Sequence, residues 1–94
     1  MLLKVTYTTR PGRREAFLEE ILKKGIDQKV REEEGCLCYV YYCALQQENE
    51  VLLMEEWESE EHQKRHMEQA HMEDLKELKN RYVLDTKIEK MQRI

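Results

Sequence analysis

The chain has 94 residues, 38% of them charged, and a formal net charge of −4. A chain of this length fits one domain over residues 1–94, and its scattered Lys and Arg residues lack the basic stripe of a nucleic-acid-binding protein. No apolar run reaches the roughly 18–20 residues of a membrane span. The chain also begins with no secretory signal and has an odd number of cysteines, so we expect a cytoplasmic protein with reduced thiols.

The first third of the chain predicts a strand and then a helix. Apolar and polar residues alternate over residues 2–9, which is typical of a strand, and Pro11-Gly12 then marks a turn. From residue 12 to residue 33 the apolar residues recur at spacings of three and four, which predicts one long helix. We expect Gly25 on its inward face, where it would allow close packing on a sheet, and Gly35 as the residue that ends it.

The middle of the chain predicts two antiparallel strands. Residues 36–45 form the first, a short polar loop follows at residues 46–50, and residues 51–57 form the second. The strand over residues 36–45 is apolar on both faces. Alternation assigns one set of side chains to a common face: Cys36, Cys38, Val40, Tyr42 and Ala44.

The last third predicts two helices and a strand. Ser59 can cap a short helix, a break near Ala70 separates it from a second helix that runs to Tyr82, and residues 83–91 alternate as a strand. The full order is β-α-β-β-α-α-β. This order predicts an α+β, ferredoxin-like fold with a four-stranded antiparallel sheet and helices on one face.

The strand over residues 36–45 also predicts a homodimer. Helices can cover only one face of a four-stranded sheet, and a second face in contact with water should be polar. Because this strand is apolar on both faces, and the chain has no further element to cover the second face, a second copy of the chain is the simplest cover.

Unusual residues concentrate between Glu55 and Met72, where the only Trp and all three His lie. His62 and His66 share one face of the short helix, and imidazole is the side chain best suited to proton transfer near neutral pH. The spacing H-x-x-x-H lacks a third ligand at a suitable position, so we expect no metal site. These histidines and Trp57 can equally be packing residues that hold the helix on the sheet.

At these residues the sequence resembles a known family. The pieces that carry the likeness, in order, are Arg10-Pro11-Gly12, Glu33-Glu34-Gly35-Cys36, Glu55-x-Trp57-Glu58-Ser59, His62, His66 and His71-Met72. Together they resemble the antibiotic biosynthesis monooxygenase family, and within it the small bacterial quinol monooxygenases, which are dimeric α/β barrels.

The resemblance implies oxygenation of an electron-rich aromatic small molecule by O₂ without flavin, metal or other cofactor. It makes His66 and His71 the candidate catalytic residues. It also suggests the walls of a substrate pocket, namely Tyr7, Glu55, Trp57 and Met67.

Two other functions stay open at this stage. One is an isomerase or processing enzyme for a small signalling metabolite of the autoinducer-2 type, and the other is a dimer that binds a small molecule without turning it over. A polar, water-filled pocket would favour the isomerase, a closed or absent pocket the binding protein, and an apolar cavity with one His at its wall the oxygenase.

Overall fold

The computed structural model describes residues 1–92 and contains the predicted succession of elements, except that two helices stand where one was predicted before the second strand. These are β1 (Leu2–Thr9), α1 (Arg14–Lys24), α2 (Ile26–Arg31), β2 (Cys36–Cys43), β3 (Glu50–Trp57), α3 (Glu60–Met67), α4 (Ala70–Tyr82) and β4 (Val83–Met91). Ser59 caps α3 as predicted, because its hydroxyl accepts a hydrogen bond from the His62 backbone N–H at 3.2 Å.

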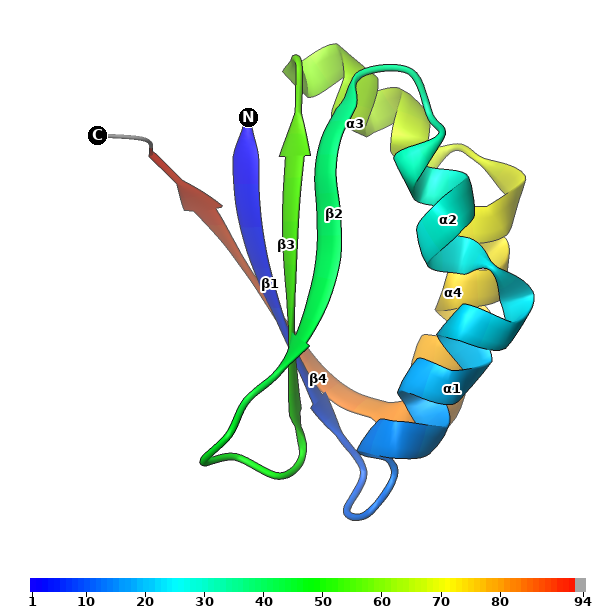
Figure 1. Cartoon of the computed structure of the whole chain (residues 1–94), viewed down its shortest axis with the longest axis vertical. Helices are drawn as coiled ribbons and strands as arrows, with labels where there is room; N and C mark the ends of the chain where they lie inside the picture. The colour runs from blue at the N-terminus through cyan, green and yellow to red at the C-terminus, as the bar shows by residue number, and fades with distance from the viewer. Residues whose placement is uncertain (93–94) are drawn as a thin grey trace.

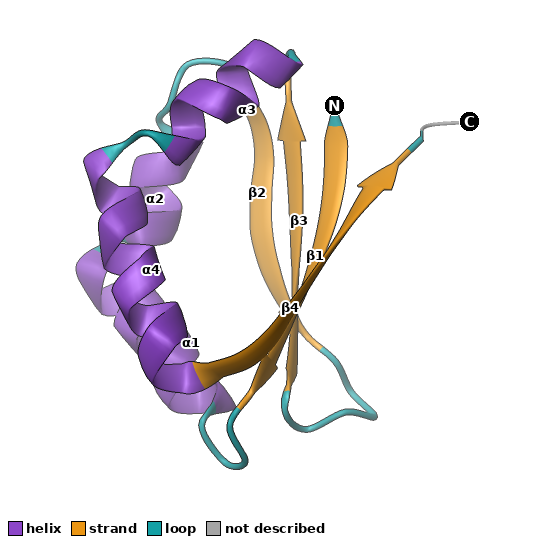
Figure 2. Cartoon of the chain, turned by 180° about the vertical axis from the view of Figure 1, so that it is seen from behind, coloured by secondary structure: helices purple, strands orange, loops and turns teal. Residues whose placement is uncertain are grey.

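The four strands form one antiparallel sheet in the order β2-β3-β1-β4. All helices lie on one face of this sheet, and the other face is uncovered (Figures 1 and 2). The predicted α+β, ferredoxin-like fold is therefore confirmed. None of the helices within residues 1–92 is long and apolar enough to cross a lipid bilayer.

The core lies between the sheet and the helices and follows from strand alternation. Along β1 and β3 every second side chain is buried, and these side chains meet the apolar faces of α1 and α4. The fully or almost fully buried apolar residues from these four elements are Leu3, Val5, Tyr7, Phe17, Ile21, Val51, Leu53, Trp57, Leu75 and Leu78.

The single long helix predicted over residues 12–33 is wrong, because Gly25 divides it into α1 and α2. Gly25 has φ +66° and its N–H donates to the carbonyls of Ile21 and Leu22, so it ends α1 in the left-handed conformation that glycine adopts most easily. An added Cβ at Gly25 would meet nothing within 4 Å, so close packing on the sheet is not its role.

Gly35 lies in the turn that leads into β2, and it does not cap a helix, since α2 ends at Arg31 with Glu32 as its cap. Its φ is +82°, and an added Cβ would overlap the His62 ring. Gly35 therefore lets α3 approach the turn between α2 and β2 closely. That approach brings residues of α3 next to Glu33.

Strand β2 departs from the predicted alternation at both ends. The pairing register shifts between Cys36 and Cys38, so Cys36 lies opposite Trp57 and Cys38 lies opposite Glu56. The two cysteines are therefore on different faces, because an irregularity of this kind displaces the alternation by one residue. The strand ends at Cys43, and Leu45 lies in the following loop with 91% of its surface exposed.

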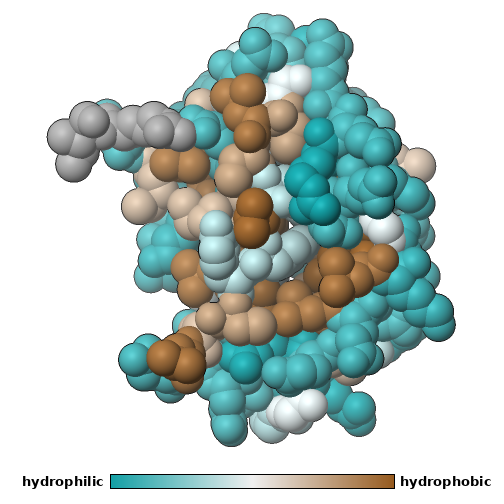
Figure 3. All heavy atoms as spheres, viewed as in Figure 1, coloured by the Kyte–Doolittle hydropathy of each residue, from teal (hydrophilic) through white to brown (hydrophobic). Residues whose placement is uncertain are grey.

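The uncovered face of the sheet carries apolar side chains on β2 and β3. Val40 pairs with Met54 and Tyr42 pairs with Leu52, and Tyr42 is 53% exposed. In a space-filling view, hydrophobic residues gather on the side of the molecule formed by the sheet, whereas the helical side is mostly hydrophilic (Figure 3). This face is the feature that the predicted homodimer requires.

Candidate functional site

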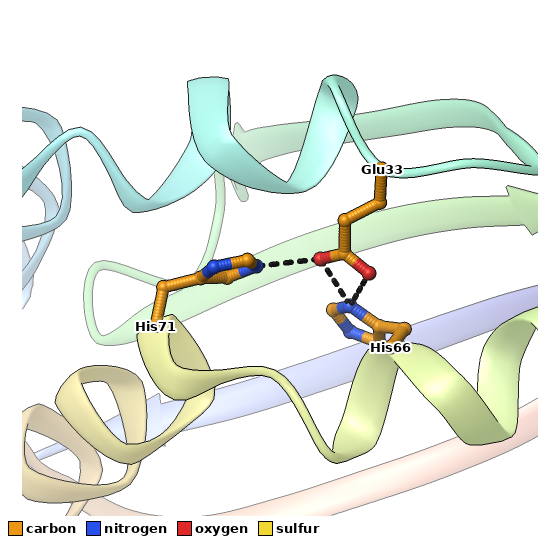
Figure 4. A group of neighbouring side chains, drawn as sticks. All are labelled: Glu33, His66 and His71. Atoms are coloured by element: carbon orange, nitrogen blue, oxygen red, sulfur yellow. Dashed lines mark hydrogen bonds and ion pairs between the residues drawn. The ribbon is translucent and has the colours of Figure 1, made fainter.

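Two imidazoles converge on one buried carboxylate, that of Glu33 (Figure 4). Glu33 lies in the turn between α2 and β2, His66 in the last turn of α3, and His71 in the first turn of α4. The Nδ1 atom of His66 is 2.9 Å from Oε2 and 3.2 Å from Oε1 of Glu33, and Nε2 of His71 is 2.6 Å from the same Oε2. One carboxylate therefore joins three segments of the chain.

These distances determine where the imidazole protons lie. A carboxylate can only accept, so the bonded nitrogen of each ring must carry a proton. In a neutral His66 ring this leaves Nε2 unprotonated, and Nε2 forms no hydrogen bond within residues 1–92. The side chain of His66 is only 1% exposed and that of Glu33 only 9%, so the pair lies in a medium where hydrogen bonds to charged groups are strong.

The same three side chains are a potential set of metal ligands. Their donor atoms lie within 4.8 Å of one another, and the set pairs His66 with His71 and Glu33 instead of with His62 of the H-x-x-x-H spacing. However, tetrahedral ligands at about 2.0–2.1 Å from a zinc ion would lie about 3.3 Å apart. The observed 2.6 and 2.9 Å separations are those of hydrogen bonds, so in this arrangement protons join the three groups.

A cavity of about 110 Å³ lies between the sheet and helices α3 and α4, and His66 forms part of its wall. Its lining is mostly apolar. Four residues predicted from the sequence line it together, namely Tyr7, Glu55, His66 and Met67, and the remaining wall comes from Leu3, Val5, Tyr39, Gln63, Met72, Leu75, Lys79, Thr86 and Ile88.

Trp57 lies behind this wall and supports two of the lining residues. Its indole N–H donates to Oε1 of Glu55 at 2.9 Å, and its ring stacks against that of His66 with centroids 4.5 Å apart. Burial raises the pKa of the Glu55 carboxyl, and repulsion by Glu33 adds to the increase, whereas the Trp57 hydrogen bond and His66 oppose it. Glu55 is thus a carboxyl group that resists ionisation beside the candidate base.

The remaining ionisable residues of the wall are two tyrosines, Tyr7 and Tyr39, and one lysine, Lys79. Burial raises the pKa of Tyr7 and of Tyr39, and the hydroxyls of Tyr39 and Tyr41 share a hydrogen bond of 3.1 Å. Burial also lowers the pKa of Lys79, whose ammonium lies 5.5 Å from the centroid of the Tyr7 ring. The tyrosines therefore present neutral hydroxyls at neutral pH.

The other two histidines do not line the cavity. His71 is connected to it only through Glu33 and His66. His62 is half-buried in the first turn of α3, where its ring packs against Gly35 and its Nδ1 lies 2.7 Å from the Ser59 hydroxyl. Sequence reasoning gave Glu33 no role, because it belongs to the acidic run Glu32–Glu34, and such runs are usually solvated surface. The signals were its place just before the turn at Gly35 and its membership of Glu33-Glu34-Gly35-Cys36, one of the pieces that carry the family resemblance.

Comparison with known proteins identifies the family. The family model described as antibiotic biosynthesis monooxygenase matches residues 1–78. The chain belongs to the antibiotic biosynthesis monooxygenase family. No curated protein sequence matches the chain.

Solved structures of chains of similar length share the fold. PA3566 from Pseudomonas aeruginosa is 24% identical with a TM-score of 0.87, over 99% of this chain and 92% of that one. A structure described as an antibiotic biosynthesis monooxygenase is 22% identical with a TM-score of 0.84, over 100% and 99%. Rv0793 from Mycobacterium tuberculosis is 17% identical with a TM-score of 0.81, over 99% and 95%. At these identities the likeness shows the fold alone.

Replacing Glu33 with Ala should destabilise the protein by about 2–4 kcal/mol, because two buried imidazole N–H groups lose their charged acceptor. Urea denaturation measures the change. Glu34→Ala is the matched control, since the Glu34 side chain is 81% exposed and lies 3.7 Å from Arg65, which is also exposed; it should cost less than about 0.5 kcal/mol. Equal costs for the two variants would contradict a structural role for the shared carboxylate.

Replacing Glu55 with Gln should stabilise the protein increasingly as pH rises. The raised pKa of Glu55 means that its ionisation favours the unfolded chain. The wild type therefore keeps its full stability below about pH 4.3, the pKa of a glutamate in the unfolded chain. Its free energy of unfolding falls as pH rises through the pKa of Glu55 in the folded protein, by about 1.4 kcal/mol for each unit by which folding raises that pKa.

Urea denaturation of the wild type and Glu55→Gln between pH 4 and pH 8 tests this expectation. The difference in unfolding free energy should move in favour of Gln as pH rises, whereas the exposed Glu58→Gln control should show no such trend. A trend of the opposite sign would mean that the folded protein stabilises the Glu55 carboxylate.

Proposed function

We propose that this protein is a monooxygenase that adds one oxygen atom of O₂ to a quinol-like or other electron-rich single-ring aromatic, without a bound cofactor. The observation that carries the proposal is His66. Its Nδ1 is held by a buried carboxylate, and its ring lines a mostly apolar cavity. A base oriented in this way is suited to removing a proton from a phenolic hydroxyl.

The proposed chemistry balances with substrate and O₂ alone. Nε2 of His66 takes a hydroxyl proton, and the resulting phenolate is electron-rich enough to pass an electron to O₂. For a hydroquinone, one oxygen atom enters the ring and the other leaves as water, while the product is a hydroxyquinone. The substrate supplies all four electrons, so the protein needs to supply a base, an apolar cavity and orientation.

Other residues act through His66 or form the wall. Glu33 sets the tautomer of His66, and His71 holds Glu33 in place, so both are positioning residues in this proposal. Trp57 fixes the His66 ring by stacking. The wall contributed by Tyr7, Glu55 and Met67 would face the substrate.

The cavity favours the oxygenase over the two alternatives. Its lining is mostly apolar, and a single histidine contributes to it, whereas an isomerase for a polar metabolite would need a water-filled polar pocket. Its volume of about 110 Å³ is comparable to the roughly 150 Å³ of a cavity known to hold benzene. An open cavity of this size also argues against a purely structural role.

We further propose that the functional unit is a homodimer in the cytoplasm. The apolar side chains on the uncovered sheet face support an interface with a second copy. The three cysteines are unpaired, which supports a reducing compartment.

Oxygen uptake with a panel of hydroquinones and catechols tests the activity on protein treated with a chelator. His66→Gln should lower kcat/KM by about 10²–10⁴, because it removes the base. Lys64→Gln, at an exposed position of the same helix, is the control and should retain activity within a few-fold. No uptake across the panel would contradict the oxygenase and favour the binding protein, and circular dichroism checks that the variants fold.

Sedimentation at micromolar concentration tests the dimer, whose mass should be twice the 11.5 kDa of one chain. Met54→Asp places a charge on the uncovered face opposite Val40 and should yield monomers. Leu22→Asp removes an exposed apolar residue of α1, on the helical side of the sheet, and should leave the dimer intact. A monomeric wild type would contradict the proposal.

A further inference from the structure

Lys79 occupies the mouth of the cavity. It extends from α4 into the space above the sheet, with its ammonium 5.5 Å from the centroid of the Tyr7 ring. The same side chain also lines two shallow surface hollows that adjoin the cavity, one beside Met72 and Glu73 and one beside Asp85 and Thr86. Lys79 therefore stands where a ligand would pass between cavity and solvent.

The charge of Lys79 has no carboxylate partner within residues 1–92. Two other lysines near the end of the chain do form ion pairs, Lys87 with Glu89 and Lys90 with Glu60. Lys79 is half-buried, and this burial lowers its pKa, so keeping the ammonium charged in the free protein carries an uncompensated cost. A half-buried cation without a partner is a natural site for an anionic group of a ligand.

The cavity has two chemically different ends. Glu55 lies opposite Leu3 in the sheet, whereas Tyr7, beneath Lys79, lies four residues farther along β1. Four residues of strand span about 13 Å of backbone, and the side chains of His66 and Lys79 both reach into the cavity from these two ends. His66 stacks on Trp57, next to Glu55, so the acid–base groups mark one end and the ammonium of Lys79 marks the other.

We propose that Lys79 binds the carboxylate of a hydroxylated single-ring aromatic acid, whose ring hydroxyl faces His66 at the other end of the cavity. This inference rests on the proposed function, since it names the substrate class of the same cavity. A ring with the hydroxyl and the carboxylate on opposite sides presents one of these groups to each end of the cavity. A neutral quinol would leave Lys79 unpaired, so the acid should be the better ligand.

The test is a binding comparison between two probes that differ in one group. The probes are 3,4-dihydroxybenzoate, which is anionic at neutral pH, and 3,4-dihydroxybenzamide, its neutral analogue. Trp57 is the only tryptophan and stacks on a residue of the cavity wall, so its fluorescence reports occupancy. Anaerobic titrations separate binding from turnover.

The wild type should bind the carboxylate at least about tenfold more tightly than the amide. Lys79→Met should bring this ratio close to one and leave the affinity for the amide nearly unchanged, and Lys79→Arg should retain most of the preference. Lys76→Met is the matched control, because Lys76 lies on the same helix but lines only a surface hollow. That variant should keep the full ratio.

Four results would overturn the inference: equal binding of the two probes by the wild type, no binding by the wild type, an unchanged ratio in Lys79→Met, or an equal loss in Lys76→Met. Oxygen uptake distinguishes this failure from failure of the proposed function. Uptake without a preference for the acid refutes only the role of Lys79, whereas a preference for the acid without uptake refutes only the oxygenase.

Discussion

The candidate site depends on one buried carboxylate that two imidazoles share. Ionised carboxylates are costly to bury unless hydrogen bonds compensate them, so Glu33 is stable in the interior only while His66 and His71 donate to it. The requirement ties the α2–β2 turn to the end of α3 and the start of α4. Gly35 makes this possible, because any side chain there would occupy the space of the His62 ring and keep α3 away.

The sheet supplies the second half of the site through the two-residue period of a strand. Glu55 and Trp57 point to the same side of β3, so one indole can donate to the carboxyl group and stack on the imidazole at once. No buried polar side-chain atom within residues 1–92 lacks a partner. Nε2 of His66 has no protein partner, so it must be accessible to solvent, and the cavity is the space that His66 lines. The base is therefore free on the side where a substrate would lie.

Much of the fold could be predicted from the sequence, because alternation and helical spacing report which face of each element is buried. The pattern could not locate the break at Gly25, since a glycine in a helical pattern can be either tolerated or used as a cap. Nor could it place Cys36, because a register shift leaves no mark on the apolar pattern. Glu33 was missed for a different reason. Its neighbours in sequence are exposed acids, and only the tertiary fold brings it to residues 33 and 38 positions away.

Glu55 and Lys79 are cavity residues of opposite charge whose ionisation burial disfavours, yet they do not neutralise each other. The pKa of Glu55 is raised and that of Lys79 is lowered, and the sheet register places Glu55 four residues along the strands from Tyr7, the residue beneath Lys79. Moving them together would satisfy both charges but would fill the cavity. A ligand with an anionic group at one end and a hydroxyl at the other can pair with Lys79 and meet the acid–base groups without that loss. The electrostatic cost of holding both groups in the empty cavity thus favours a ligand that complements both of them. Ionisable groups with shifted pKa values are common at functional sites.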